Sequence, residues 1–260
     1  VNDNGDNAMC WSGEASAVLA VIGLTSTVYV AFKGEDIRLW TALGYFSLME
    51  ALQAYTYIYI DDCADLHNQI ATLLGFIHIV FQPFLINSVS LYFIPRQVAK
   101  RIQWWVIAAV FPCSVLLLIA VYPFDWGPVC TAGTDTMCGK SLCSVSGSWH
   151  IAWEIPRMHF WYGLLPYAVA GFVLPILYGS WKFTLYHIVT GPALALLTTS
   201  NPNEFPAVWC LYSIGLLLIV AKTRVRNWLF VDRWIFYNYS GSRHAIARWN
   251  KHGITPAAKF

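Results

Sequence analysis

Residues 66–93 read LHNQIATLLGFIHIVFQPFLINSVSLYF, a run of 28 residues without Lys, Arg, Asp or Glu. A transmembrane helix needs about 20 mostly apolar residues, so this stretch is long enough to cross a bilayer. The rest of the chain has the same character: 57% of its 260 residues are hydrophobic and 12% are charged, against about 25% charged residues in an average soluble protein. This composition excludes a disordered chain, a coiled coil and an ordinary soluble enzyme, and it predicts an integral, multi-pass membrane protein.

Six further apolar windows accompany this run. Together the windows predict seven transmembrane helices, over residues 13–32, 39–60, 66–93, 104–121, 159–178, 183–199 and 206–221. The predicted fold class is therefore all-α, a bundle of seven transmembrane helices. Ser12 is the expected N-cap of the first helix. Four prolines inside the windows should kink or end helices locally, namely Pro83, Pro166, Pro175 and Pro192.

These windows divide the chain into three parts. Residues 1–12 form a polar N-terminal tail, residues 13–221 the transmembrane domain, and residues 222–260 a basic, aromatic cytoplasmic tail expected to lie partly along the membrane surface. One connection is long, the outer loop of residues 122–157, and its segment 148–155 is expected to form a short amphipathic helix. The first twelve residues contain no Lys or Arg and do not resemble a signal peptide, so the first helix is expected to direct insertion.

Charged residues are distributed unevenly between the two sides of this bundle. If the N-terminus is outside, 14 of the 16 Lys and Arg residues fall on inner segments, whereas ten of the 14 Asp and Glu residues fall on outer segments. Cytoplasmic loops carry an excess of Lys and Arg. The pattern therefore predicts an N-terminus outside and a cytoplasmic C-terminus.

Five of the seven cysteines fall on the predicted outer side. They are Cys10, Cys63, Cys130, Cys138 and Cys143. Compartments outside the cytosol permit oxidation, so we expect one or two disulfides that pin the long loop, with the pairing left open. The alternative is ligation of a soft metal by cysteines of this loop.

Polar side chains near the middle of the second and third predicted helices form a candidate intramembrane centre. Glu50 and Gln53 share one face of the second helix, and His78 and Gln82 share one face of the third. Glu50 and His78 each lie eleven residues from the outer rim, a depth of about 16 Å. We therefore predict that Glu50 and His78 interact, with the two glutamines as hydrogen-bond support. The pair is either structural or a centre that handles protons or binds a ligand; ligation of a cofactor by His78 is a further alternative.

A second group of polar side chains is predicted at the outer rim. Nitrogen and carboxylate ligands suit zinc or another divalent ion, and such a site would serve a metal-dependent, hydrolase-like membrane enzyme. A solvated acidic rim whose histidines only titrate is the simpler interpretation. The candidate ligands are His67, Asp61, His150, Glu154 and His159.

Residues 9–12, Met-Cys-Trp-Ser, are followed by Glu14 and Ser16. This stretch resembles the start of a family of uncharacterised multi-helix membrane proteins that open with Met-Cys-Trp-Ser or Met-Cys-Phe-Ser. The Glu-x-x-Gln pattern at residues 50–53, in the second predicted helix, also resembles the sequences of this family. The resemblance implies a multi-helix membrane protein and brings no known activity.

Three functions stay open from the sequence. The favoured one is a binding or sensing protein, or a subunit of a complex, with a polar ligand- or ion-binding centre in the bundle. The alternatives are an outer-facing metal-dependent membrane enzyme and a proton-coupled transporter that uses Glu50 and His78. The expected partner is the lipid bilayer and not a nucleic acid. Association into a homo-oligomer or a larger membrane complex, and a divalent metal such as zinc as cofactor, are left open.

Overall fold

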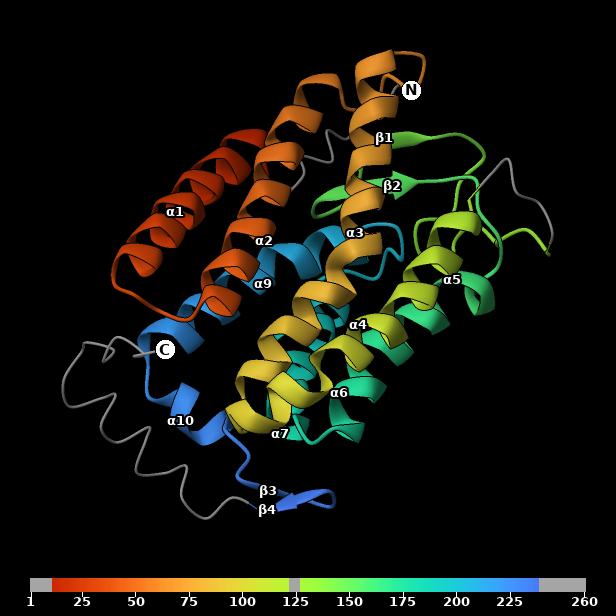
Figure 1. The fold of residues 1–260 in the computed structure, drawn as a ribbon. Helices are drawn as coiled ribbons and strands as arrows, with labels where there is room; N and C mark the ends of the chain where they lie inside the picture. The colour runs from red at the N-terminus through yellow and green to blue at the C-terminus, as the bar shows by residue number, and fades with distance from the viewer. Residues whose placement is uncertain (1–10, 122–126, 239–260) are drawn as a thin grey trace.

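The computed structural model describes residues 11–121 and 127–238, which are mostly helical (Figure 1). The helices are α1 (Gly13–Phe32), α2 (Ile37–Thr56), η1 (Tyr57–Tyr59), α3 (Leu66–Tyr92), α4 (Arg96–Ile119), α5 (Phe160–Ala168), η2 (Val169–Val173), α6 (Leu174–Leu177), α7 (Trp181–Ile188), η3 (Val189–Ala193), α8 (Leu194–Thr198), α9 (Phe205–Lys222) and α10 (Val225–Leu229). The strands are β1 (Cys143–Ser146), β2 (Ile151–Glu154), β3 (Arg233–Trp234) and β4 (Tyr237–Asn238). The mostly helical architecture expected from the apolar windows is confirmed.

Helices occupy all seven of the predicted windows. The elements α5, η2 and α6 follow one another without a break over residues 160–177, as do α7, η3 and α8 over residues 181–198. Within the described residues, α1, α3, α4 and α9 are each long and apolar enough to cross a membrane. The largest difference is at α4, which begins at Arg96 instead of residue 104, because hydropathy detects the apolar part of a helix and not its basic first turns.

The local interruptions lie where prolines were expected to cause them. The π-helical segment η2 lies between Pro166 and Pro175, and η3 contains Pro192. Proline has no N–H to donate to the preceding turn, and π-type bulges are one way in which a helix accommodates the lost bond. Proline does not end every helix, since α3 continues through Pro83. Ser12 caps α1 as predicted, because its side chain accepts a hydrogen bond from the Ala15 N–H.

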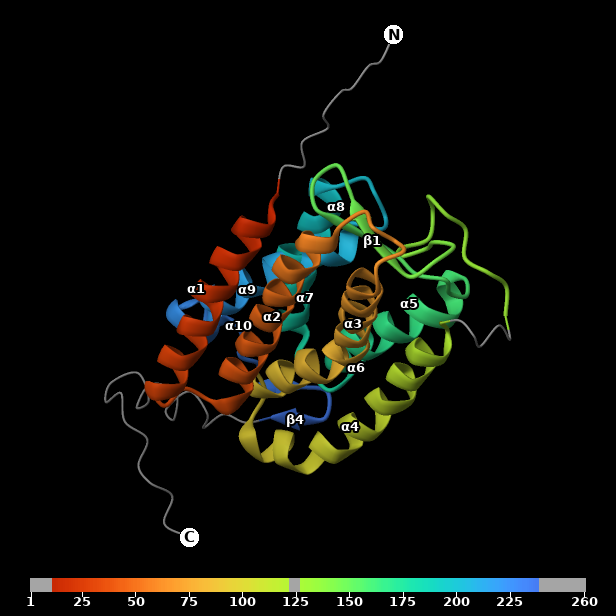
Figure 2. The ribbon, with the colours of Figure 1, turned by 90° about the horizontal axis from the view of Figure 1, so that it is seen from above.

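The loops gather at two opposite ends of the bundle. At one end, which we call the outer end, the β1–β2 hairpin meets the α8–α9 loop through a bond from the Trp153 N–H to the Asn203 carbonyl (3.0 Å). At the other, inner end, the Val231 N–H donates to the Phe93 carbonyl (2.9 Å). Figure 2 shows α1 beside α2 at one edge of the bundle and α4 at the other.

Charges follow these two ends. Among the described residues, the inner end carries ten Lys and Arg residues and three acidic residues, whereas the outer end carries two basic and seven acidic residues. An ion pair between Arg226 and Glu35 (2.6 Å) joins α10 to the α1–α2 loop at the inner end. The structure therefore gathers the charge asymmetry of the sequence into two opposed faces.

The expected amphipathic helix over residues 148–155 is wrong. Residues 151–154 form strand β2, which pairs antiparallel with β1 so that Ser144 lies opposite Trp153. The first three residues of β2 are all buried, because the hairpin lies against the ends of the helices. A helix would place His150 and Glu154 on one face; instead His150 precedes this strand and Glu154 ends it.

Two disulfides stabilise the outer end. Cys63 pairs with Cys143, and Cys130 pairs with Cys138. The expected disulfides are thus formed by four of the five candidates. These bonds leave the three loop cysteines no free thiolate, so the alternative of soft-metal ligation is wrong. Cys10, like the rest of residues 1–10, lies outside the described residues, as do residues 122–126 of the outer loop and residues 239–260 of the basic tail.

Candidate functional site

A column of polar side chains runs along the inward face of α2. Glu50 is fully buried and the Gln53 side chain is almost fully buried. Both carboxyl oxygens of Glu50 and both amide atoms of Gln53 have no hydrogen-bond partner among the residues that the structure describes. Tyr57 continues the same face one turn closer to the outer end, because positions 50, 53 and 57 follow helical spacing. Four buried polar atoms without partners are unusual in a well-packed bundle.

The surroundings of Glu50 come from α1 and α9. The Ser16 hydroxyl on α1 faces the carboxyl group but lies outside hydrogen-bond geometry. The carboxyl group is close enough to the Cys210 thiol and to the Tyr57 hydroxyl to interact electrostatically with both. Within residues 11–121 and 127–238, no basic side chain forms an ion pair with Glu50.

The predicted contact between Glu50 and His78 is not formed. The His78 ring stacks on Tyr45, with 3.8 Å between ring centroids, and its Nε2 has no partner in residues 11–121 and 127–238. The neighbouring Met49, and not Glu50, faces α3. Its terminal methyl group packs against Gly75, where a Cβ atom would lie 3.5 Å from it. One residue along a helix rotates the side chain by about 100°, which turns Glu50 away from α3.

Gln82 contributes to the same region from α3. Its Oε1 accepts from the Tyr167 hydroxyl (2.8 Å), and its Nε2 donates to the Cys210 sulfur (3.0 Å). Cys210 thus accepts a hydrogen bond from Gln82 and lies near enough to the Glu50 carboxyl to interact with it electrostatically. Sequence reasoning missed Cys210 and Tyr167, because a cysteine and a tyrosine in apolar windows look like ordinary core residues.

An aromatic lid covers the outer end of the column. Trp11 stacks on Trp149 (5.7 Å between centroids) and on His150 (5.9 Å). The Trp11 indole N–H donates to the Ser16 hydroxyl (2.8 Å), and the Tyr57 hydroxyl lies 3.1 Å from His150 Nδ1. We name Trp11, Tyr57, Trp149 and His150 the outer lid.

His150 is the most constrained member of the outer lid. Its side chain is fully buried, and its Nδ1 accepts a hydrogen bond from the Ile151 N–H (2.7 Å). The ring proton therefore lies on Nε2, for which the described part of the chain supplies no partner. Burial lowers the pKa of His150 to about 3, so the ring is neutral at physiological pH.

The burial of His150 predicts that the free energy of unfolding decreases as the pH is lowered. Protonation in the unfolded chain, near pH 6.5, favours unfolding while the folded ring stays neutral down to about pH 3. The His150 contribution is therefore lost as the pH falls from about 6.5 towards 3, at up to about 1.4 kcal/mol per pH unit. We expect His150→Gln to flatten the dependence of the free energy of unfolding on pH between 7 and 5. His67→Gln at the exposed His67 should leave the slope unchanged; equal slopes in wild type and His150→Gln would contradict the prediction.

The predicted metal ligands at the outer rim do not converge. His67 is exposed, with its Nδ1 2.7 Å from the Tyr55 hydroxyl, and His159 Nε2 lies 3.8 Å from Asp135. Glu154 is half-buried opposite Cys143 in the hairpin. In the part of the chain that the structure describes, no group of three or more His, Cys, Asp and Glu side chains could hold a metal ion. The predicted zinc site is therefore not assembled there.

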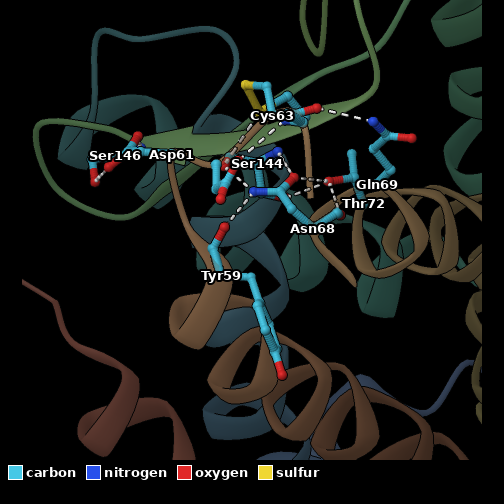
Figure 3. The surroundings of a disulfide bond; sticks show 11 residues. Tyr59, Asp61, Cys63, Asn68, Gln69, Thr72, Ser144 and Ser146 are labelled. Carbon is cyan, nitrogen blue, oxygen red and sulfur yellow. Dashed lines mark hydrogen bonds between the residues drawn. A yellow bond between two sulfur atoms is a disulfide. The ribbon is translucent and has the colours of Figure 1, made fainter. Parts of the chain in front are cut away.

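The turn between α2 and α3 instead fastens the β1 strand (Figure 3). Asp61 accepts hydrogen bonds from the N–H (2.7 Å) and the hydroxyl (2.5 Å) of Ser146. Asn68 donates to the Ser144 carbonyl (2.9 Å) and accepts from the Ser144 N–H (2.8 Å), close to the Cys63–Cys143 disulfide. Asp61, a predicted metal ligand, thus serves as a structural acceptor.

Glu204 is a structural residue that the sequence did not reveal. It is fully buried before α9. Its carboxylate accepts from the Ser148 and Trp149 backbone N–H groups, the Ser148 hydroxyl, the Thr199 hydroxyl and the Asn201 amide. Because one of these donors belongs to Trp149, the carboxylate positions the outer lid. In the sequence it was one more acidic residue of an outer loop.

The chain matches over residues 14–230 a family described as a family of unknown function (DUF5765). No curated protein matches the sequence, and no solved structure matches it. The match includes the column and most of the outer lid, and it begins after the Met-Cys-Trp-Ser stretch of residues 9–12. The uncharacterised family suggested by the sequence is therefore confirmed, without the opening motif.

Proposed function

Since the chain belongs to this family of unknown function, we propose from its own residues that it is a multi-pass membrane protein that binds a small cation at Glu50 and Gln53. The cation is a proton or an alkali metal ion. In this role the protein acts as a binding or sensing protein and not as a catalyst.

The observation that carries the proposal is the set of unpartnered oxygens at the centre of the bundle. A buried polar group without a hydrogen bond costs about 1–3 kcal/mol, and a buried charge costs more. Glu50 supplies two such oxygens and Gln53 supplies one. Carboxylate and amide oxygens are the ligands that hard cations prefer, and a positive charge at this position would compensate the carboxylate. The outer lid lies over the outer end of this column, where the Tyr57 hydroxyl meets His150.

We propose seven transmembrane passes, with the N-terminus outside and the C-terminus cytoplasmic. The seven helical segments and the charge difference between the two ends support this topology. The outer end also carries both disulfides, which form readily outside the cytosol.

Cysteine labelling tests this topology. We expect Lys140→Cys to react with a membrane-impermeant maleimide on intact cells, and Lys100→Cys to react only after permeabilisation. The unsubstituted chain measures the background from its own thiols. Labelling of Lys100→Cys on intact cells with protection of Lys140→Cys would reverse the proposed orientation.

Thermal unfolding in lipid nanodiscs tests the cation site. We expect the midpoint of the wild-type protein to depend on pH, or on which of Li⁺, Na⁺, K⁺ and N-methylglucamine is present at constant ionic strength. A cation at 100 times its Kd would stabilise the folded state by about 2.7 kcal/mol. Glu50→Gln should abolish the response to the cation, and in a His150→Gln background also the response to pH, because it removes the charge and keeps the shape.

The matched control is Ser114→Ala, which alters a buried and unpartnered polar side chain of α4 away from the column. It should keep the wild-type response. The proposed site would be excluded if the wild-type midpoint did not respond to the cation and the His150→Gln midpoint did not respond to pH. A Glu50→Gln variant that keeps the full cation response would also exclude it.

A proton-coupled transporter is the second candidate. It is favoured by the π-helical segments η2 and η3, since interrupted helices are typical of transporters and π-bulges often lie at functional sites. Such a transporter would use Glu50 without the His78 partner that the sequence suggested. Movement of protons or Na⁺ into proteoliposomes, abolished by Glu50→Gln, would separate this candidate from a binding protein.

A further inference from the structure

A short hairpin at the inner end presents two bare apolar side chains. Ile235 and Phe236, at the turn between β3 and β4, are 80% and 78% exposed. The hairpin is held firmly against the bundle: the Trp234 indole N–H donates to the Leu177 carbonyl (3.0 Å). Gly179, with φ +103°, lets Trp234 pack closely on the α6–α7 turn. In Figure 1 the hairpin lies beyond the inner ends of α7 and α10.

Basic and indole side chains flank this hairpin. The Lys182 ammonium donates to the Phe230 carbonyl (3.3 Å) and lies between the rings of Trp181 (5.8 Å) and Trp228 (6.0 Å). Trp228 is 59% exposed, and Arg233 on β3 is also exposed. An ammonium between two indoles next to an apolar turn is typical of groups placed at the level of lipid headgroups.

We propose that this inner-face surface binds an anionic phospholipid of the inner leaflet. Ile235 and Phe236 enter the upper acyl region, and Lys182 and Arg233 contact the headgroup phosphate. The surface consists of Trp181, Lys182, Trp228, Arg233, Ile235 and Phe236.

Charge complementarity favours a lipid over a soluble partner. The inner end carries ten basic and three acidic residues within the described chain, and anionic leaflets attract such clusters. The exposed apolar tip needs a hydrocarbon environment, which a free phosphate ion does not provide. The inference rests on the membrane orientation proposed above, and it does not depend on cation binding at Glu50.

Site-directed spin labelling measures the depth of the hairpin. Phe236→Cys in a Cys113→Ser background would carry the label in nanodiscs that contain phosphatidylglycerol. We expect the label to be more accessible to oxygen than to a water-soluble nickel chelate. Lys140→Cys in the same background is the aqueous control and should show the opposite order.

Native mass spectrometry measures lipid choice. After purification from an equal mixture of phosphatidylglycerol and phosphatidylcholine, the wild-type protein should retain phosphatidylglycerol in at least threefold excess. Lys182→Gln/Arg233→Gln should reduce the excess to near one, and Lys140→Gln at the outer end should keep it. An unchanged excess in the double variant, or a Phe236→Cys label that reacts mainly with the nickel chelate, would overturn the proposal. If the lipid proposal failed in this way but Glu50 kept its cation response, the cation site would stand independently of the lipid surface.

Discussion

Removing the Cys63–Cys143 disulfide, as Cys63→Ser/Cys143→Ser, is expected to lower the free energy of unfolding by about 4.5 kcal/mol. The bond joins residues 80 positions apart and fastens the β1 strand to the turn between α2 and α3. In the chain-entropy description, a cross-link stabilises the folded state more when it closes a longer loop in the unfolded chain. The measurement is reversible unfolding in mixed micelles, compared with the unsubstituted protein.

The second disulfide is the matched control. Cys130 and Cys138 are eight positions apart, and the same description predicts a smaller loss of about 2.5 kcal/mol for Cys130→Ser/Cys138→Ser. Both variants remove one disulfide from the same end of the bundle. An equal loss, or a larger loss for the shorter loop, would show that the Cys63–Cys143 bond does not govern the stability of the outer end.

Replacing Glu204 with leucine is expected to be the most damaging single substitution outside the column. The change removes a buried carboxylate that accepts hydrogen bonds from four residues: Ser148, Trp149, Thr199 and Asn201. Buried donors left without a partner cost about 1–3 kcal/mol each. We expect a total loss of about 3 kcal/mol or more in the free energy of unfolding, or no recovery of folded protein.

A milder variant keeps this prediction measurable. Glu204→Gln preserves the size of the side chain but turns one acceptor into a donor, so it should be less destabilising than Glu204→Leu. Glu154→Gln, a half-buried glutamate of the neighbouring hairpin, should change the stability by less than about 0.5 kcal/mol. A loss at Glu204→Leu no greater than that at Glu154→Gln would mean that the carboxylate does not organise the outer end.

The outer end connects these two predictions with the proposed function. The Trp11 N–H donates to the Trp149 carbonyl (3.0 Å), and Glu204 holds the Trp149 N–H. Loss of Glu204 should therefore loosen the outer lid as well as the hairpin. We therefore expect the cation to exchange faster at Glu50 in Glu204→Gln than in the wild-type protein.

Features that depend on neighbouring residues could be predicted from the sequence. Hydrophobic length located the helices, because a segment of about 20 apolar residues has few other stable arrangements in a bilayer. The Ser12 cap was predictable, because it involves residues three positions apart. The side of the bundle on which the cysteines lie followed from the helix count and the distribution of Lys and Arg.

The site itself depended on tertiary structure. Sequence spacing placed Glu50 and His78 at one depth, but the rotation of α2 about its axis directs Glu50 towards α1 and α9, and His78 stacks on Tyr45 instead. That rotation is set by the packing of several helices at once, including the contact of Met49 with Gly75. The residue pattern of one helix alone does not specify its rotation relative to its neighbours.

The same reason explains the outer loop. Residues 151–154 carry no local signal that decides between helix and strand; pairing with residues 143–146 decides it, because the disulfide and the Asn68 hydrogen bonds hold that partner in place. Glu204 likewise acquires its role only when the loops before α9 and after β1 meet. The sequence by itself therefore determined where the helices lie, how charge divides between the two ends of the bundle and which end carries the disulfides, because these features arise from local chemistry and hydrophobic length. The tertiary structure alone decided which polar groups face one another, because these contacts join segments far apart in the chain.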